Sequence, residues 1–391
     1  MPAERQSARF LALYALAWAG GSIAYVPFLT VLLPARVAAE AGDAAIGWLA
    51  YLSFGGAIAA SLANILAGWL SDLTGNRRGW IVAGLVASGA LLTLFGRVEG
   101  LAALLAVLLA WQVAINMILA PLAAWAGDCV PDGQKGVLGG LLSFAPASGA
   151  LAGVLVTYPG LAGPQDRLVI VAGLVAATVL PVLVFGRPRP VAVSTAPDPD
   201  RAGADAPAPR VVARMWLARL LMQISESALF AYLYLWMRSL DPSFNDASTA
   251  RLFLAVLAVG VPVALIVGRW SDRAGRPVAP LRAASLLAAC GLCVMALAPG
   301  VGVALVGYAL FSLVMTVFLA LHSAQVLRVL PRTDRRGRDL GFFNLTNTVP
   351  SLVMPWLTLS LVPQLGFTAL FGVLALFALI AARLLAPLSA G

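Results

Sequence analysis

The chain has 391 residues, of which 61% are hydrophobic and only 11% are charged. A soluble globular domain is about one quarter charged, and the mean hydropathy here is +0.92. The composition therefore excludes a soluble globular protein and predicts an integral membrane protein. The net charge of +9 does not require a nucleic acid, because the basic residues gather in loops on one side of the apolar segments.

Twelve apolar segments are long enough to cross a hydrocarbon core of about 30 Å. They lie near 11–34, 46–70, 79–96, 101–127, 136–158, 167–186, 214–237, 249–268, 279–298, 301–327, 340–362 and 365–386. They are rich in Ala, Leu and Gly and lack the two-residue alternation of strands, so we expect α-helices, which satisfy their own backbone hydrogen bonds in lipid.

The distribution of basic residues predicts the orientation. Twenty of them fall in segments assigned to one side, and the other side holds only Arg36, Arg97, Arg167, Arg238 and Arg251. By the positive-inside rule both termini face the cytoplasm. The near-exclusive use of Arg over Lys, together with abundant Ala, indicates a GC-rich bacterial genome and hence the bacterial inner membrane.

The first apolar segment is longer than a signal-peptide core, so we expect it to remain as the first helix. Trp18, Ser22 and Tyr25 fall on one face of it, in line with Tyr14. Polar groups inside a span usually face a cavity. Trp18, Ser22 and Tyr25 are therefore candidate substrate contacts. Packing or use at the membrane interface is the alternative for this aromatic stripe.

A short hydrophilic loop, Gly68-Trp-Leu-Ser-Asp-Leu-Thr-Gly-Asn-Arg-Arg78, follows the second apolar segment. Asp72 can cap the next helix and pair with a guanidinium, which suggests a latch on the cytoplasmic side; a loop that only sets topology is the alternative. The candidate gating residues of this half are Gly68, Asp72, Gly75, Arg77, Arg78 and Asp128. In the fourth segment, Trp111, Gln112 and Asn116 are further candidate substrate contacts.

A connector divides the chain into halves. Residues 187–210 are rich in Pro, Ala and charge, which favours disorder over a folded domain. We expect an N-terminal six-helix bundle at 1–186, a cytoplasmic linker at 187–212 and a C-terminal six-helix bundle at 213–391.

Glu226, in the seventh segment, is the only acidic residue near the centre of an expected span. Hydrocarbon penalises a charged carboxyl group, so this side chain can alternate between protonated and ionised forms. It is the first candidate for proton coupling; an ion pair with Arg219 is the structural alternative. Gln223 lies on the same helical stripe and is a candidate substrate contact.

The hydrophilic loop recurs after the eighth segment as Gly268-Arg-Trp-Ser-Asp-Arg-Ala-Gly-Arg-Pro277, 200 residues downstream of the first copy. The candidate gating residues of this half are Gly268, Asp272, Gly275 and Arg276. A chain that repeats one membrane unit predicts two pseudo-symmetric six-helix bundles.

The tenth and eleventh segments carry the remaining polar candidates. Tyr308, Ser312, Asn344 and Asn347 are candidate substrate contacts, and His322, the only histidine, is the second candidate for proton coupling. Hydrogen bonding to a neighbouring helix is the alternative for this histidine.

Enzymatic chemistry is not expected. One histidine and three cysteines cannot readily build a metal site, and no HExxH, GxSxG or Walker sequence occurs. The Cys290-x-x-Cys293 spacing lies in an apolar helix and favours packing over redox chemistry. We predict no catalytic residue, no metal and no cofactor, with a proton or Na⁺ as the coupling ion.

Twelve expected helices, a long cytoplasmic middle loop and GxxSDxxGxxR after helices two and eight resemble the major facilitator superfamily over nearly the whole chain. The resemblance implies the fold of that superfamily, all-α with twelve transmembrane helices, in which helices 1, 4, 7 and 10 line a central cavity. Residues 341–350 and the short SDxxGxRR loop are also similar to its sucrose and glycoside cation-symporter branches.

The expected function is secondary active transport by alternating access. Amides, hydroxyls and indoles without a cluster of intramembrane Arg or Lys favour a small, mostly neutral solute such as a sugar or glycoside, moved with protons. A proton-driven drug or metabolite efflux antiporter is the alternative, although residues 145–150 keep only part of the Gly-Pro-x-x-Gly-Gly pattern typical of that class. The expected partners are the solute and the lipid bilayer, with no nucleic acid, and we expect a monomer.

Overall fold

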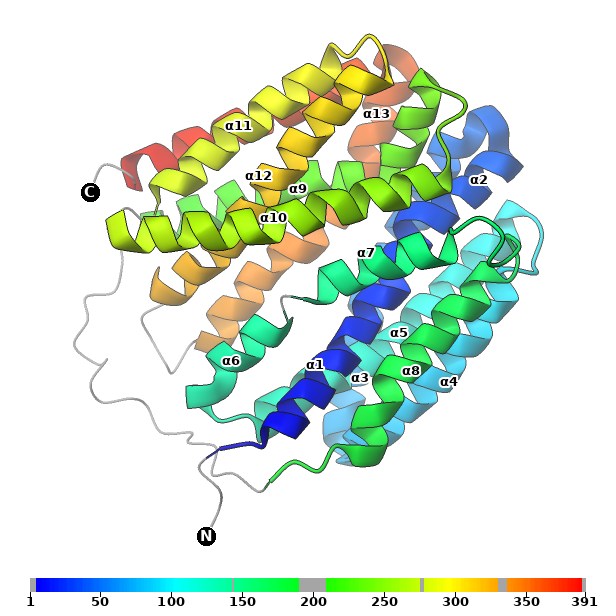
Figure 1. Cartoon of the computed structure of the whole chain (residues 1–391), viewed down its shortest axis with the longest axis vertical. Coiled ribbons are helices and arrows are strands. Elements are labelled where there is room, and N and C mark those ends of the chain that lie inside the picture. The colour runs from blue at the N-terminus through cyan, green and yellow to red at the C-terminus, as the bar shows by residue number, and fades with distance from the viewer. Residues whose placement is uncertain (1–4, 143, 190–208, 275–277, 330–335, 389–391) are drawn as a thin grey trace. The chain divides into compact units, whose positions relative to one another are not determined.

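The structure, a computed structural model, describes residues 5–142, 144–189, 209–274, 278–329 and 336–388 (Figure 1). Within these ranges the chain is helical and forms no strand. The elements are α1 (Ala8–Tyr25), the π-helix η1 (Val26–Leu32), α2 (Leu33–Ala41), η2 (Gly42–Ala44), α3 (Ala45–Thr74), α4 (Arg77–Phe95), α5 (Leu101–Cys129), α6 (Asp132–Leu142), α7 (Ala145–Val156), α8 (Arg167–Phe185), α9 (Pro209–Leu240), α10 (Asp246–Ala274), α11 (Ala279–Ala296), α12 (Val301–Val329), α13 (Arg336–Leu385) and η4 (Ala386–Leu388).

Nine helical stretches of the described ranges are long and apolar enough to cross a membrane. Two of them, Ala8–Thr74 and Val349–Leu385, each cover two of the expected spans. Within the second stretch Gly366 has φ 73° and ψ 179°, which breaks the helix a few residues after the expected boundary. Multi-pass membrane insertion thus agrees with the sequence, while the count of twelve spans stays a prediction.

The expected fifth span, 136–158, differs from the structure. The chain forms two shorter helices there, α6 and α7, and Pro146 lies in the first turn of α7. Proline has no backbone N–H and its ring fits a first helical turn, so it favours a helix start at this point. A hydropathy pattern cannot reveal such a break because the flanking residues remain apolar.

The chain divides into two compact units. Unit 1 comprises Met1–Thr195 and Asn245–Leu254, and unit 2 comprises Ala196–Phe244 and Ala255–Gly391. The first boundary between the units, after Thr195, falls inside the segment expected to be a linker. Residues 190–208 of that segment lie outside the described ranges. The assignment of Asn245–Leu254, the start of α10, to unit 1 is a feature that the sequence does not predict.

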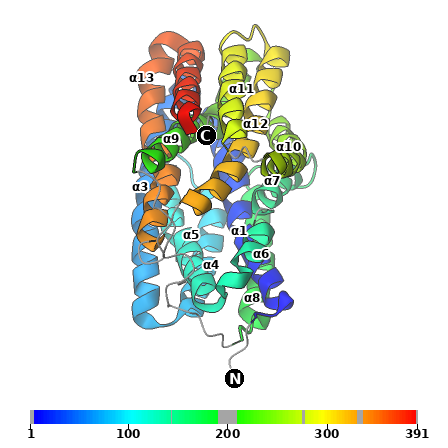
Figure 2. The same ribbon diagram turned by 90° about the vertical axis from the view of Figure 1, so that its left-hand side faces the viewer.

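Unit 1 is held together by α1 packed on α7 and α8, and by α5 packed on α3 and α4 (Figure 1). In unit 2, α13 packs on α9 and α11, and α11 runs beside α12 in both views (Figures 1 and 2). Large apolar side chains are exposed on these helices and on α10, as a lipid-facing surface requires; examples are Ile65 and Trp69 on α3, and Leu265 and Ile266 on α10.

The contact between α4 and α5 depends on a glycine. A Cβ atom added to Gly84 would lie 2.8 Å from the backbone oxygen of Ala114, which cannot move without displacing α5. Small residues at helix interfaces allow such close backbone approach in membranes.

We expect Gly84→Ala to destabilise the purified protein by about 1–3 kcal/mol, the usual cost of overpacking a core. The matched control is Gly173→Ala on α8, because an added Cβ there meets no atom within 4 Å. Thermal unfolding in one detergent should show a lowered midpoint for Gly84→Ala only; equal midpoints for the two variants would contradict the tight contact.

Candidate functional site

In unit 1 a polar network joins α1, α3 and α5. The Tyr25 hydroxyl donates to Gln112 Oε1 at 2.8 Å, and Asn116 Nδ2 lies 3.4 Å from the same hydroxyl. Asn64 of α3 donates through Nδ2 to Asn116 Oδ1 at 3.0 Å. Three amides from α3 and α5 and the phenol at the end of α1 therefore meet, and their donors and acceptors can recognise a hydroxylated solute.

The other unit 1 candidates lie around this network. Trp111 has no exposed surface, and its indole N–H donates to Ser88 at 3.0 Å. Its ring centroid lies 5.2 Å from that of Tyr25, so the geometry makes Trp111 a support for Tyr25. Trp18 and Ser22 are partly exposed on α1, and the Trp18 ring stacks on the buried Tyr14 at 6.4 Å.

In unit 2 an arginine organises the polar residues of α9 and α12. Arg219 donates from Nε to Gln223 Oε1 at 3.1 Å and from Nη1 to Ser323 Oγ at 3.0 Å. His322 is fully buried, and its Nε2 lies 3.0 Å from the Met215 carbonyl oxygen. A carbonyl only accepts, so Nε2 carries the hydrogen, and Nδ1 is left to accept from Arg219 Nη1 at 3.4 Å.

This arrangement separates the two candidates for proton coupling. Both ring nitrogens of His322 are engaged, and a proton on Nδ1 would face the Arg219 guanidinium. The Glu226 carboxylate, partly buried two turns along α9 from Arg219, forms neither a hydrogen bond nor an ion pair with the described residues. Arg219 and Tyr308 lie within its electrostatic reach. The proton-coupling roles of Glu226 and His322 stay predictions, and of the two side chains only that of His322 has hydrogen-bond partners among the described residues.

Four further candidates lie on α12 and α13. Tyr308 is buried and Ser312 is partly exposed on α12. Asn344 and Asn347 belong to α13, and their side chains are outside what the structure describes. Their role as substrate contacts stays a prediction.

At the predicted cytoplasmic ends of α3, α4 and α5, Arg77 joins two carboxylates. It pairs with Asp72, and its Nε lies 3.1 Å from Asp128 Oδ2. Its Nη1 also donates to the buried Ser71 hydroxyl at 2.7 Å. We call Asp72, Arg77, Asp128 and Ser71 the Arg77 cluster.

The expected loop is mostly helical, because α3 extends to Thr74 and α4 begins at Arg77, so only Gly75 and Asn76 lie between the two helices. Gly75 ends α3 with φ 61°, a left-handed conformation that suits glycine. The guanidinium of Arg78 lies 5.2 Å from the Trp125 ring centroid and donates to the Gly186 carbonyl. The expectation that Asp72 caps α4 is wrong, because Asn76 is the cap and accepts from Gly79 N at 2.9 Å. Gly68 lies one turn before Asp72 on α3.

The second copy of the loop is described only in part. Gly268 and Asp272 lie on α10, and a Cβ on Gly268 would touch Leu321 of α12 at 3.4 Å. Ser271, the counterpart of Ser71, is buried as well. Gly275 and Arg276 lie outside the described residues, so their gating role stays a prediction.

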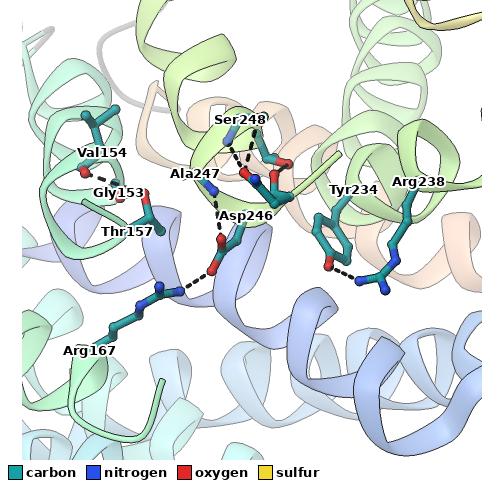
Figure 3. A network of polar contacts seen from close by, with 11 residues as sticks. Gly153, Val154, Thr157, Arg167, Tyr234, Arg238, Asp246, Ala247 and Ser248 are labelled. Atoms are coloured by element: carbon teal, nitrogen blue, oxygen red, sulfur yellow. Dashed lines mark hydrogen bonds and ion pairs between the residues drawn. The ribbon is translucent and has the colours of Figure 1, made fainter. Parts of the chain in front are cut away.

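Two features of the site were not predicted from the sequence. The first is Asn64, which closes the unit 1 network. The second is an ion pair within unit 1 between Arg167, at the start of α8, and Asp246, at the start of α10 (Figure 3). The pair is mostly buried, with side-chain exposures of 17% and 21%. Asn245 caps α10 beside it and accepts from Ser248 N at 2.9 Å.

We expect Asp246→Asn to loosen the first turns of α10, because it leaves the mostly buried Arg167 without its counter-charge. Ala250, one turn further along α10, is 1% exposed. A cysteine introduced there should react several-fold faster with a water-soluble maleimide in the Asp246→Asn background.

Asp241→Asn is the matched control for this experiment. Asp241 lies five residues before Asp246, just after α9, and hydrogen bonds from Ser243 lower the pKa of its partly exposed carboxyl, but it forms no ion pair with any residue that the structure describes. Unchanged labelling in Asp246→Asn, or equal acceleration in both variants, would show that the ion pair does not fasten α10.

The described helices and their polar networks are those of an all-helical integral membrane protein. The chain matches the family model described as Major Facilitator Superfamily over residues 10–327 and, in a second match, over residues 215–390. The chain belongs to this superfamily, whose members carry small molecules across membranes. None of the curated protein sequences is significantly similar to it.

Solved structures share the fold at low sequence identity. A bacterial homolog of the human lysosomal transporter Spinster, inward-facing and occupied, has a TM-score of 0.72 at 14% identity, over 98% of this chain and 96% of that one. The human organic anion transporter MFSD10 has a TM-score of 0.65 at 16% identity, over 96% and 99%. The inward-open xylose transporter XylE of E. coli has a TM-score of 0.67 at 12% identity, over 96% and 94%.

Proposed function

We propose that this transporter moves a small, mostly neutral organic solute, such as a sugar or glycoside, and couples the movement to protons. The observation that carries the proposal is Glu226, a carboxyl group in the middle of α9 without a hydrogen bond or ion pair among the described residues. A carboxyl group held in this way inside a membrane is a functional group by default, because a purely structural one is normally paired.

The solute class follows from the polar network of α1, α3 and α5. Tyr25, Gln112, Asn116 and Asn64 offer amide and hydroxyl groups and no formal charge. Such groups match the alternating donors and acceptors of a polyhydroxylated molecule. In unit 2 the one intramembrane guanidinium of the described site, Arg219, is already engaged by Gln223 and Ser323, which disfavours a strongly anionic solute.

Reconstituted protein tests this function directly. Liposomes with an imposed pH gradient should accumulate one member of a panel of labelled sugars and glycosides, and a protonophore should abolish the accumulation. Movement of solute against the direction of the proton flux would instead assign the efflux antiporter. Accumulation that follows a Na⁺ gradient and ignores the protonophore would refute proton coupling.

A further inference from the structure

Unit 2 contains a groove of about 530 Å³ between the first turns of α9, the start of α11 and the end of α13. We name it the arginine groove after Arg214, Arg282 and Arg383, one from each helix. The end of α13 lies beside the start of α11 (Figure 1). By the predicted orientation these helix ends lie at the cytoplasmic surface of the membrane.

No acidic side chain of the described residues neutralises these three arginines. None of the residues that line the groove is acidic. Among the described residues, none of the three forms an ion pair or a hydrogen bond. Arg282 and Arg383 are exposed and Arg214 is partly exposed, so all three can reach a ligand. Three like charges around one groove repel each other, and an anion bound among them would relieve that repulsion.

The remaining residues that line the groove are apolar, and three of them lie deeper along the helices than the arginines do. On α11, Leu286 lies one turn deeper than Arg282, and on α13, Ile380 and Leu376 lie about one and two turns deeper than Arg383. These three apolar side chains are 38–54% exposed. Both helices therefore present charge at the membrane surface and an open apolar strip below it.

This order matches one class of ligand. A phospholipid places a phosphate at the surface and an acyl chain beneath it, and guanidinium groups bind phosphate oxygens through paired, charge-assisted hydrogen bonds. Basic pockets between helices on the cytoplasmic side suit anionic headgroups. A free anion would use the arginines but would leave the apolar strip uncovered.

We propose that the arginine groove binds one anionic phospholipid of the inner leaflet, with its phosphate on Arg214, Arg282 and Arg383 and an acyl chain along Leu286, Leu376 and Ile380. This site goes beyond the proposed transport function and does not depend on it. Its test measures lipid binding and requires no substrate.

The experiment uses the purified full chain and phosphatidylglycerol, with binding followed by native mass spectrometry. The triple variant Arg214→Gln/Arg282→Gln/Arg383→Gln should bind phosphatidylglycerol at least about tenfold more weakly than the wild-type protein does, because it loses all three charge-assisted contacts. The matched control is Arg9→Gln/Arg187→Gln/Arg273→Gln, which removes the same charge from exposed arginines outside the groove and should bind as wild type does. The wild-type protein and the triple variant should bind phosphatidylcholine, which has no net charge, with equal affinity.

Two further measurements distinguish a bound phospholipid from a bound free phosphate ion. Inorganic phosphate at millimolar concentration should not displace the lipid, and Leu286→Ser/Leu376→Ser should weaken lipid binding although every arginine remains. Full displacement by inorganic phosphate, or unchanged binding in the leucine variant, would overturn the lipid assignment in favour of a simple anion site. Equal losses in the two arginine variants would overturn the site itself.

Discussion

Glu226→Gln is expected to abolish proton-driven accumulation of substrate while exchange of labelled for unlabelled substrate continues. The glutamine amide resembles the protonated carboxyl group in size and hydrogen bonding but cannot release a proton. A carrier locked in the loaded form can still change its orientation with substrate bound, so exchange survives and net coupling is lost. The measurement compares accumulation under a pH gradient with counterflow at equal pH, in the same liposomes.

The control for this variant is Glu99→Gln, in the exposed loop between α4 and α5. It removes the same charge and should leave both assays unchanged. Glu226→Asp keeps the carboxyl group and should retain part of the accumulation. Undiminished accumulation in Glu226→Gln would falsify the coupling role, whereas loss of exchange as well would assign Glu226 to substrate binding or folding.

Much of the fold could be predicted because a membrane imposes strong constraints on sequence. A span needs a long apolar run and must satisfy its own backbone, so hydropathy alone located most helices. The same constraint explains the failure at the fifth span. The break between α6 and α7 leaves the composition apolar, and only Pro146 marks it.

The site was predictable along each helix but not between helices. Gln112 and Asn116 are one turn apart, so helical geometry places them on one face, and the structure joins both to Tyr25. Asn64 and Asn116 lie 52 residues apart, and Arg167 and Asp246 lie 79 apart. Contacts of this kind depend on how neighbouring helices rotate and pack, which the periodicity of one helix does not encode.

The same reasoning explains the error at Asp72. An N-cap residue directly precedes the first helical residue, whereas Asp72 lies in the last turn of α3, five residues before α4 begins at Arg77. The left-handed turn at Gly75 sets Asn76 at the cap and turns Asp72 toward Arg77. Asp72 therefore belongs to the Arg77 cluster, and Asn76 caps α4.

The second large effect is expected at this Arg77 cluster. We propose that it stabilises one arrangement of the cytoplasmic ends of α3, α4 and α5 that must change during transport. Arg77 is mostly buried, with 17% of its side chain exposed, whereas Asp72 is 61% exposed. An exposed carboxylate contributes under about 1 kcal/mol to overall stability. Asp72→Asn should therefore fold normally.

Transport should nevertheless respond, because a contact made in only one of two states changes their ratio by its full differential energy. We expect Asp72→Asn to slow transport by up to about fivefold, which corresponds to about 1 kcal/mol, while substrate affinity stays within a few-fold. Cysteines introduced near Asn116 and Asn347 should become more accessible from the cytoplasmic side.

The control is Asp43→Asn, which removes an exposed carboxylate of η2 that joins no ion pair within the described ranges. Asp72→Glu keeps the charge and should recover part of the rate. A normal rate with unchanged accessibility in Asp72→Asn would mean that the loop sets topology only, since an ion pair that persists through the whole cycle cannot bias it.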